Sequence, residues 1–149
     1  MNSKQISLLA AFLAANVEFA VVGGIAVNAH GYSRATNDLD IFIRPTEENA
    51  RAAFNALLAL GVPLTGLEPF DLLGDQENVR FGPEHDHIDI LASIGEMTFD
   101  KVWRNRVVTK VEGLSIPFIC KADLIKNKLQ IGRQRDIADA EELALIPDE

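Results

Sequence analysis

The segment VVGGIAVNAHGYSRATNDLDIFI, residues 21–43, sets the expected fold. An apolar run ends in a glycine pair, a short helical pattern follows, and the chain returns through an Asp-Leu-Asp triplet into a second apolar run. Short apolar runs bounded by turn residues are typical of buried strands. The segment therefore predicts a strand, a helix and a strand at Glu18–Val22, Ile25–His30 and Leu39–Ile43, with Gly31 closing the helix.

The composition is that of a globular protein, and it limits the classes of function. The chain has 149 residues, 48% of them hydrophobic, and a formal net charge of −8. We expect one domain over residues 1–149 and no general binding to nucleic acid, whose affinity depends on neutralising phosphates. Cys120 is the single cysteine, no apolar run is long enough to cross a bilayer, and the first residues lack a signal-peptide pattern. We therefore expect a cytoplasmic protein without a membrane partner.

Outside this segment the pattern alternates between helices and strands. Helices are predicted from Ile6, from Pro45 to Gly61, and at Phe99–Arg104, Lys121–Ile131 and Asp136–Leu145. Strands are predicted at Asn78–Phe81, His87–Leu91, Val107–Val111 and Leu114–Ile119. The predicted apolar faces of two helices are Ala50, Phe54, Leu57 and Leu58, and Leu124, Ile125, Leu129 and Ile131. This order predicts an α/β (α+β) fold with a mixed sheet flanked by helices and two helices at the C-terminus.

The glycine pair Gly23-Gly24 is suited to an anion. Glycine lets the backbone approach a ligand closely, and the start of the following helix directs N–H groups and the positive end of its dipole toward that ligand. The pair is therefore interpreted as a phosphate-binding turn. A tight turn that only packs a helix against a strand would use the same two residues.

Asp38 and Asp40 are suited to a divalent cation. Residues i and i+2 of a strand project to the same face, so the two carboxylates lie together while Leu39 and Ile41 point into the core. Neighbouring carboxylates repel each other unless a cation lies between them, and such oxygen-rich sites suit Mg²⁺ together with substrate phosphates. The alternative is the ordinary end of a strand with two solvated acids.

Asp89 lies inside the apolar run HIDIL, residues 87–91, where an unpaired charge is unfavourable. A metal shared with Asp38 and Asp40 would stabilise it. In two-metal phosphoryl transfer, an extra carboxylate helps to hold the cation that activates the attacking hydroxyl, and it can accept the proton. A hydrogen bond to the backbone or to an arginine would also explain an acid at this position.

Three short motifs together resemble one known family. They are Val22-Gly23-Gly24, then Arg34-x-Thr36-x-Asp38-Leu39-Asp40-Ile41, and Ile88-Asp89-Ile90. With these motifs the chain resembles the nucleotidyltransferase superfamily related to DNA polymerase β. Within that superfamily it is similar to small single-domain members of the lincosamide nucleotidyltransferase type. It also resembles the nucleotidyltransferase-type toxins of abortive-infection toxin–antitoxin systems, through Asp123-Leu124-Ile125-x-x-Lys128-Leu129, Gly132-Arg133 and Asp136-x-x-Asp139.

The resemblance implies Mg²⁺-dependent transfer of a nucleoside monophosphate from a nucleoside triphosphate such as ATP to an acceptor hydroxyl, with release of pyrophosphate. It implies that Gly23 and Gly24 bind the β- and γ-phosphates. It also implies that Asp38, Asp40 and Asp89 are the catalytic residues and hold the metal in a two-metal site. Many relatives have Gly-Ser at the glycine pair, so this chain lacks one hydroxyl donor. A cognate antitoxin or another operon partner follows from the same resemblance.

Three further residues are predicted to bind the triphosphate. Lys128 falls inside the apolar arc of its helix and needs an anion, which a triphosphate or Asp136 would supply. A Lys128–Asp136 ion pair joining the two C-terminal helices, or Asp136 as an N-cap, would be purely structural. Arg34 and Thr36 precede the aspartates on a predicted loop, and Arg34 would bind phosphate or acceptor unless it is an ordinary surface arginine.

The acceptor is the part of the reaction that the sequence does not define. A small hydroxylated molecule such as an antibiotic, a tRNA and a protein side chain all stay open. Residues 121–135 carry five basic side chains against one acid, which suits either a local nucleic-acid contact or the triphosphate. Two other classes of protein are a non-catalytic partner protein on the same scaffold and a metal-dependent phosphohydrolase. A zinc site at His85-Asp86-His87 is disfavoured, because no cysteine and no HExxH spacing accompanies it.

Overall fold

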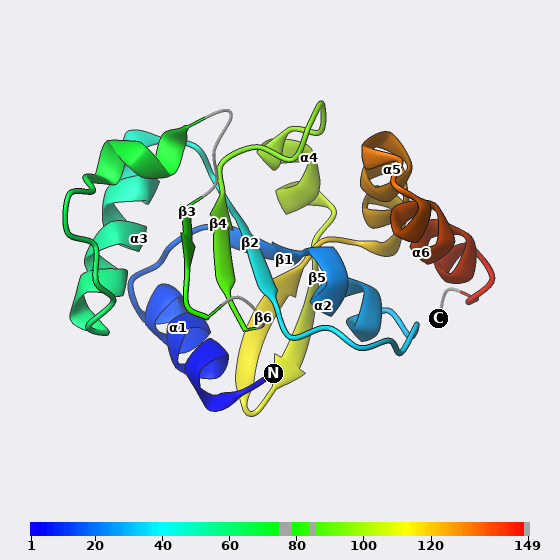
Figure 1. Cartoon of the computed structure of the whole chain (residues 1–149), viewed down its shortest axis with the longest axis horizontal. Helices are drawn as coiled ribbons and strands as arrows, with labels where there is room; N and C mark the ends of the chain where they lie inside the picture. Colours follow the sequence, from blue (N-terminus) through cyan, green and yellow to red (C-terminus); the bar gives the residue numbers. More distant parts are fainter. Residues whose placement is uncertain (75–78, 84–85, 148–149) are drawn as a thin grey trace.

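The computed structural model describes residues 1–74, 79–83 and 86–147, and its elements follow the order that the sequence predicts (Figure 1). The helices are α1 Ser3–Ala14, α2 Gly23–Ala29, α3 Glu47–Ala59, α4 Phe99–Arg104, α5 Lys121–Ile131 and α6 Gln134–Ala144, with a 3₁₀ helix η1 at Pro69–Leu73. The strands are β1 Phe19–Val22, β2 Leu39–Ile43, β3 Val79–Phe81, β4 Ile88–Leu91, β5 Val107–Val111 and β6 Leu114–Phe118. The predicted strand start, Asn78, lies outside the described residues.

The six strands form one mixed sheet in the order β3-β4-β2-β1-β6-β5. The central strands β1 and β2 are antiparallel, whereas β1 pairs with β6, and β2 with β4, in parallel. The outer pairs β3–β4 and β5–β6 are antiparallel. The prediction of a mixed sheet flanked by helices, with two helices at the C-terminus, is confirmed.

The register places four residues in one row across the sheet. Val22 lies opposite Asp40, Asp40 lies opposite Asp89, and Asp89 lies opposite Arg80 on the outermost strand β3. Side chains opposite each other on neighbouring strands project to the same face. The row therefore gathers two acids and one arginine beside the end of β1, where the chain turns into α2.

Helices α1 and α3 lie toward one end of the molecule, and α5 and α6 lie at the other (Figure 1). α1 packs against α3, which also contacts η1, whereas α5 and α6 pack against each other at the opposite end. α1 begins with a reciprocal cap between Asn2 and Gln5, and α3 begins with the Thr46 hydroxyl accepting from the Asn49 N–H. The core-facing apolar residues of these two helices are Leu8, Leu9 and Phe12, and Ala50, Ala53, Phe54, Ala56 and Leu57.

Two of the predicted apolar faces are wrong in part. Leu58 on α3 is 49% exposed, and Leu129 and Ile131 on α5 are 53% and 49% exposed. α5 turns a largely polar face inward, because its buried side pairs with polar groups of α6 and of the segment after β4. The residues it buries are Asp123, Leu124, Asn127 and Lys128.

The starts of α2 and α6, which lie at the site described below, differ from the prediction. α2 begins at Gly23, two residues before the predicted start at Ile25. The reason is that Gly23, which directly follows β1, turns the chain there with a φ of +69°. α6 begins at Gln134, with Arg133 as its N-cap residue, so Asp136 lies inside the first turn and is not the N-cap. None of the described helices combines the length and the hydropathy needed to cross a membrane.

Candidate functional site

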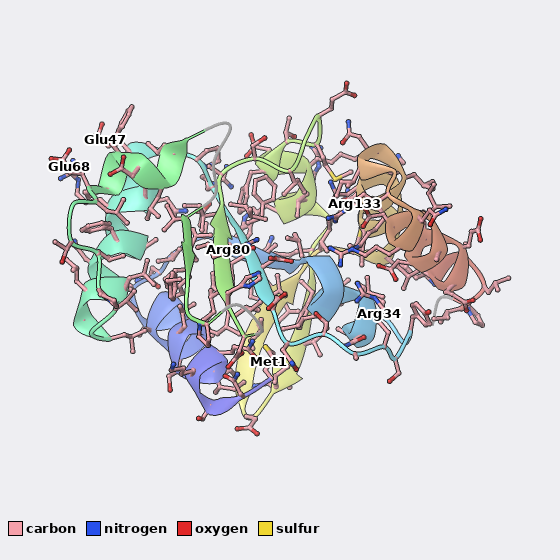
Figure 2. All side chains as sticks on the ribbon, viewed as in Figure 1. Met1, Arg34, Glu47, Glu68, Arg80 and Arg133 are labelled. Atoms are coloured by element: carbon pink, nitrogen blue, oxygen red, sulfur yellow. The ribbon has the colours of Figure 1, made fainter. Side chains whose placement is uncertain are left out.

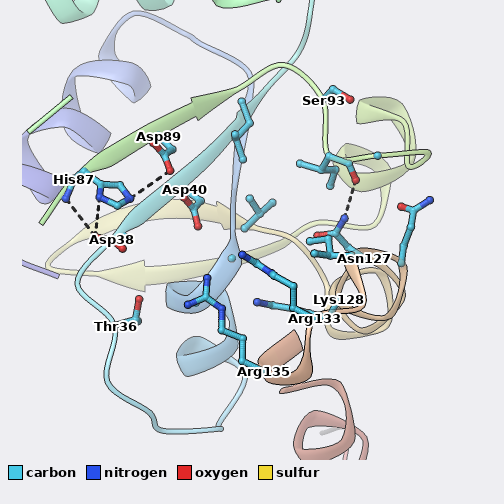
Figure 3. Close-up of a pocket in the computed structure, with 18 of the residues that line it drawn as sticks. Thr36, Asp38, Asp40, His87, Asp89, Ser93, Asn127, Lys128, Arg133 and Arg135 are labelled. Atoms are coloured by element: carbon cyan, nitrogen blue, oxygen red, sulfur yellow. Dashed lines mark hydrogen bonds and ion pairs between the residues drawn. The ribbon is translucent and has the colours of Figure 1, made fainter. Parts of the chain in front are cut away.

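A cavity of about 730 Å³ opens beside the end of β1, between the acidic row of the sheet and the α5–α6 pair (Figure 3). Every residue that the sequence predicts for metal or nucleotide lines it, although these residues come from segments far apart in the chain. They are Gly23, Gly24, Arg34, Thr36, Asp38, Asp40, Asp89 and Lys128.

Gly23 and Gly24 are required by the packing of the cavity itself. A Cβ added to Gly23 would lie 2.1 Å from Oδ2 of Asp40, and one added to Gly24 would lie 2.8 Å from Oγ1 of Thr36. The positive φ of Gly23 also disfavours any other residue. The glycine pair thus lets the start of α2 approach the side chains of the acidic row and of the loop before β2.

Asp38, Asp40 and Asp89 form an acidic wall on the strand side of the cavity. Asp40 lies between the other two and is largely buried. Burial raises the pKa of Asp40 to about 7, and the charge of Asp89, a hydrogen bond with Asp89 and the charge of Asp38 add to that shift. The Asp40 carboxyl is therefore only partly ionised near pH 7, and a divalent cation would stabilise its ionised form.

Asp89 is already paired in the described structure. Arg80 donates to it in bidentate fashion, with Nε 2.7 Å from Oδ1 and Nη2 3.0 Å from Oδ2. The His87 ring bridges to both neighbours, with Nδ1 3.4 Å from Asp38 and Nε2 3.5 Å from Asp89. Among the described residues, no three Asp, Glu, His or Cys side chains are arranged around one point as metal ligands. His85, the first residue of the disfavoured zinc motif, lies outside the described residues.

Lys128 and Arg34 form the basic wall, and acids of α6 hold both of them. The Lys128 Nζ is 3.2 Å from Asp136 Oδ1 and 3.1 Å from Asp139 Oδ2. Arg34 donates from Nη2 to Asp139 at 2.9 Å, and its Nε lies 2.9 Å from the other oxygen in an ion pair without hydrogen-bond geometry. The sequence left a triphosphate or Asp136 as the anion that pairs with Lys128. The structure contains the Lys128–Asp136 ion pair.

Asp136 is completely buried and is the centre of this basic wall. Besides Lys128 it accepts a hydrogen bond from Arg133 Nε at 2.6 Å. Burial alone would raise the pKa of Asp136, but the hydrogen bonds and charges of Arg133 and Lys128 outweigh burial and hold that pKa below its ordinary value. The carboxylate is thus ionised and fixes the two cations at the edge of the cavity.

Sequence reasoning missed three arginines that line the cavity. Arg133 and Arg135 reach it from the start of α6, and Figure 3 shows both facing the acidic wall across the opening. Arg135 makes no ion pair within the described part of the chain. Arg80 comes from β3, on the opposite side (Figure 2). The sequence offers no signal for Arg80, because the turn residues do not fix the register that places it opposite Asp89.

Comparisons with known proteins bear on the fold. No protein-family model matches the chain, and no curated protein sequence matches it. Among solved structures, it is similar to the lincomycin-bound crystal structure of LnuA, a lincosamide antibiotic adenylyltransferase. The match covers 99% of this chain and 98% of LnuA, with a TM-score of 0.62 and 15% sequence identity. The chain has the nucleotidyltransferase fold. Residues of the acidic row and the glycine pair both line the cavity described above.

Proposed function

We propose that the protein is a nucleotidyltransferase that depends on a divalent cation, with Mg²⁺ as the expected metal. It transfers a nucleoside monophosphate from a nucleoside triphosphate to a hydroxyl group of an acceptor and releases pyrophosphate. The fold shared with LnuA supports nucleotidyl transfer in general. The particular reaction is inferred from the cavity.

The opposite charge of the two cavity walls is the observation that carries the proposal. Three carboxylates lie on the strand side, and cationic side chains of α5, α6 and the loop before β2 lie on the other. A cation bound to a triphosphate has the same separation of charge, with a metal on one side and phosphate oxygens on the other. The cationic side chains are Arg34, Lys128, Arg133 and Arg135.

Asp38, Asp40 and Asp89 fit a divalent cation by their chemistry. All three offer carboxylate oxygens, and burial together with the charges of Asp89 and Asp38 raises the pKa of Asp40, so a cation would stabilise its ionised form. A bound Mg²⁺ would neutralise charge on the phosphates and lower the barrier to attack. These three residues would hold it, once Asp89 is released from Arg80.

The residues of the chain act mainly by positioning. Arg135 and Arg133 bind phosphate oxygens, and backbone N–H groups near Gly23 and Gly24 donate to the outer phosphates. The acceptor hydroxyl oxygen forms a bond to the α-phosphorus, the bond from that phosphorus to the pyrophosphate oxygen breaks, and the hydroxyl proton passes to Asp89. Pyrophosphate carries away the electron pair of the broken bond.

Incubation with labelled nucleoside triphosphates, Mg²⁺ and total cell extract tests the reaction. We expect a labelled product from the wild type, whose size after fractionation assigns the acceptor to small molecules, tRNA or protein. Lincomycin with ATP is a defined acceptor to include, because LnuA is a lincosamide adenylyltransferase. No labelled product with any nucleotide would contradict the proposal.

Two variants make the test specific. Asp40→Ala should abolish transfer and triphosphate–Mg²⁺ binding, whereas Glu48→Gln, an exposed acid at the start of α3 outside the cavity, should retain both. Arg135→Gln should weaken binding of the triphosphate about tenfold with less effect on the monophosphate. Pyrophosphate release that does not need an acceptor would assign the protein to the phosphohydrolases. Equal activity of both acid variants would contradict a role for the acidic wall.

A further inference from the structure

We propose that Arg80 competes with the divalent cation for Asp89 and thereby sets the cation affinity of the acidic wall. This inference depends on the proposed function in one respect, namely that the acidic wall takes a cation. It adds a residue that neither the sequence motifs nor the fold comparison identifies.

The contact between Arg80 and Asp89 occupies both oxygens of the carboxylate. Nε and Nη2 of Arg80 each donate to a different oxygen, at 2.7 and 3.0 Å. A guanidinium matched to a carboxylate in this bidentate way forms one of the stronger ion pairs in proteins. A cation that bound Asp89 would have to displace at least one of these two donors.

Arg80 is placed so that it can leave. Its side chain is 58% exposed on the edge strand β3, while that of Asp89 is only 7% exposed. Asp89 is the sole carboxylate within ion-pair distance of Arg80 among the described residues. When the ion pair separates, the guanidinium of Arg80 returns to solvent, where it is well hydrated. The buried carboxylate of Asp89 then needs another positive charge.

The ion pairs of the basic wall give the contrast. Lys128 is 6% exposed against a fully buried Asp136, and Arg34 is 25% exposed against Asp139 at 3%. Arg133, which also pairs with Asp136, is 56% exposed, but the enclosed Lys128 contacts both Asp136 and Asp139. Both acids therefore keep a buried cation even if the exposed one leaves, so exchange with solvent cations is disfavoured. Within the described part of the chain, Arg80 alone combines an accessible cation with an acid that lies opposite Asp40 on the neighbouring strand.

Binding of Mn²⁺ alone, without nucleotide, tests the competition by titration followed with electron paramagnetic resonance. Arg80→Gln removes the competitor, and Arg80→Lys keeps the charge but cannot donate from two fixed nitrogens. We expect Arg80→Gln to bind Mn²⁺ about tenfold more tightly than the wild type, and Arg80→Lys about threefold more tightly. Arg51→Gln is the matched control, because Arg51 is also exposed and paired, with Glu47, at the far end of the molecule (Figure 2).

Thermal or urea unfolding gives an independent readout. Without metal, Arg80→Gln leaves Asp89 without its partner and should be less stable than the wild type; Mn²⁺ should then stabilise the variant more than it stabilises the wild type. The inference is overturned if Arg80→Gln binds Mn²⁺ no more tightly than the wild type. It is also overturned if Arg80→Lys equals the wild type, since the charge alone would then explain the change.

These results separate the inference from the proposed function. If the wild type binds Mn²⁺ and transfers nucleotide but Arg80→Gln gains no affinity, the competition is refuted and the function stands. If Arg80→Gln gains affinity but the wild type forms no labelled product, the competition stands and the transferase proposal fails. If neither protein binds Mn²⁺, the inference is refuted together with the metal dependence.

Discussion

Asp40→Asn is expected to stabilise the metal-free protein at pH 8, although it removes a residue proposed to be catalytic. The pKa of Asp40 is raised from 3.8 to about 7, by burial first and then by Asp89 and Asp38. A group whose pKa is higher in the folded state favours folding below its unfolded pKa, and this contribution is lost as the pH rises through the folded value. The window for Asp40 is therefore about pH 4 to 7.

The size of the effect follows from the shift in pKa. From 3.8 to about 7 the free energy of unfolding would fall by at most about 4 kcal/mol, at about 1.4 kcal/mol per unit. Because Asp40 is partly exposed and solvent screens part of the interaction, we expect roughly half of that for the single substitution. The asparagine variant stays neutral, so its stability advantage over the wild type should be smallest at pH 4.5 and about 2 kcal/mol at pH 8.

Urea unfolding in the presence of a chelator measures this difference. Trp103, the single tryptophan, stacks on Phe99 and reports unfolding by fluorescence. Glu48→Gln, which also removes one exposed negative charge, controls for net charge and should show no such pH dependence. Adding Mg²⁺ at pH 8 should narrow the gap by stabilising the wild type. A difference between Asp40→Asn and the wild type that stays constant from pH 4.5 to 8 would refute the reasoning.

Two further substitutions have matched controls within the chain. Gly23→Ala should lower the free energy of unfolding by about 2 kcal/mol or more and reduce transfer at least about 100-fold, because its Cβ would displace Asp40. Gly61→Ala, with a similar φ but open space around it, should cost about 1 kcal/mol and leave transfer intact. Lys128→Met should cost about 3 kcal/mol in urea unfolding, because it leaves two buried acids short of a cation, whereas the exposed Lys126→Met should change stability by less than about 0.5 kcal/mol. Equal effects within either pair would contradict the assigned packing.

The part of the site that lies in one local segment was predictable from the sequence. Period-2 alternation predicted that Asp38, just before β2, and Asp40 within it project to the same side, and the glycine pair indicated a close approach of the backbone. Asp89 was found because a charge inside an apolar run needs a partner. These inferences use only neighbouring residues, so they do not require the tertiary structure.

The parts of the site that the sequence did not predict depend on strand register and on packing between distant segments. Arg80 faces Asp89 only because the β3–β4 pairing has one particular register, which turn residues did not fix. Asp139 holds Arg34 from 105 positions away in the chain. The buried face of α5 was misread for the same reason, because its inner residues pair with distant polar groups and do not follow hydropathy alone.

The buried and half-buried acids of this cavity fall into two groups with different consequences. Asp136 and Asp139 share Lys128, a cation that is enclosed with them, so their charge is compensated inside the fold. Asp40 has a raised pKa, and the bidentate partner of Asp89 is a cation on the exposed edge strand. A buried carboxylate lowers the stability of the fold when its charge is not fully neutralised, or when its paired cation can leave. A ligand that binds the carboxylate would remove this cost. The presence or absence of an enclosed cation, and not burial alone, distinguishes the acids that stabilise the fold from the acids proposed to bind a ligand.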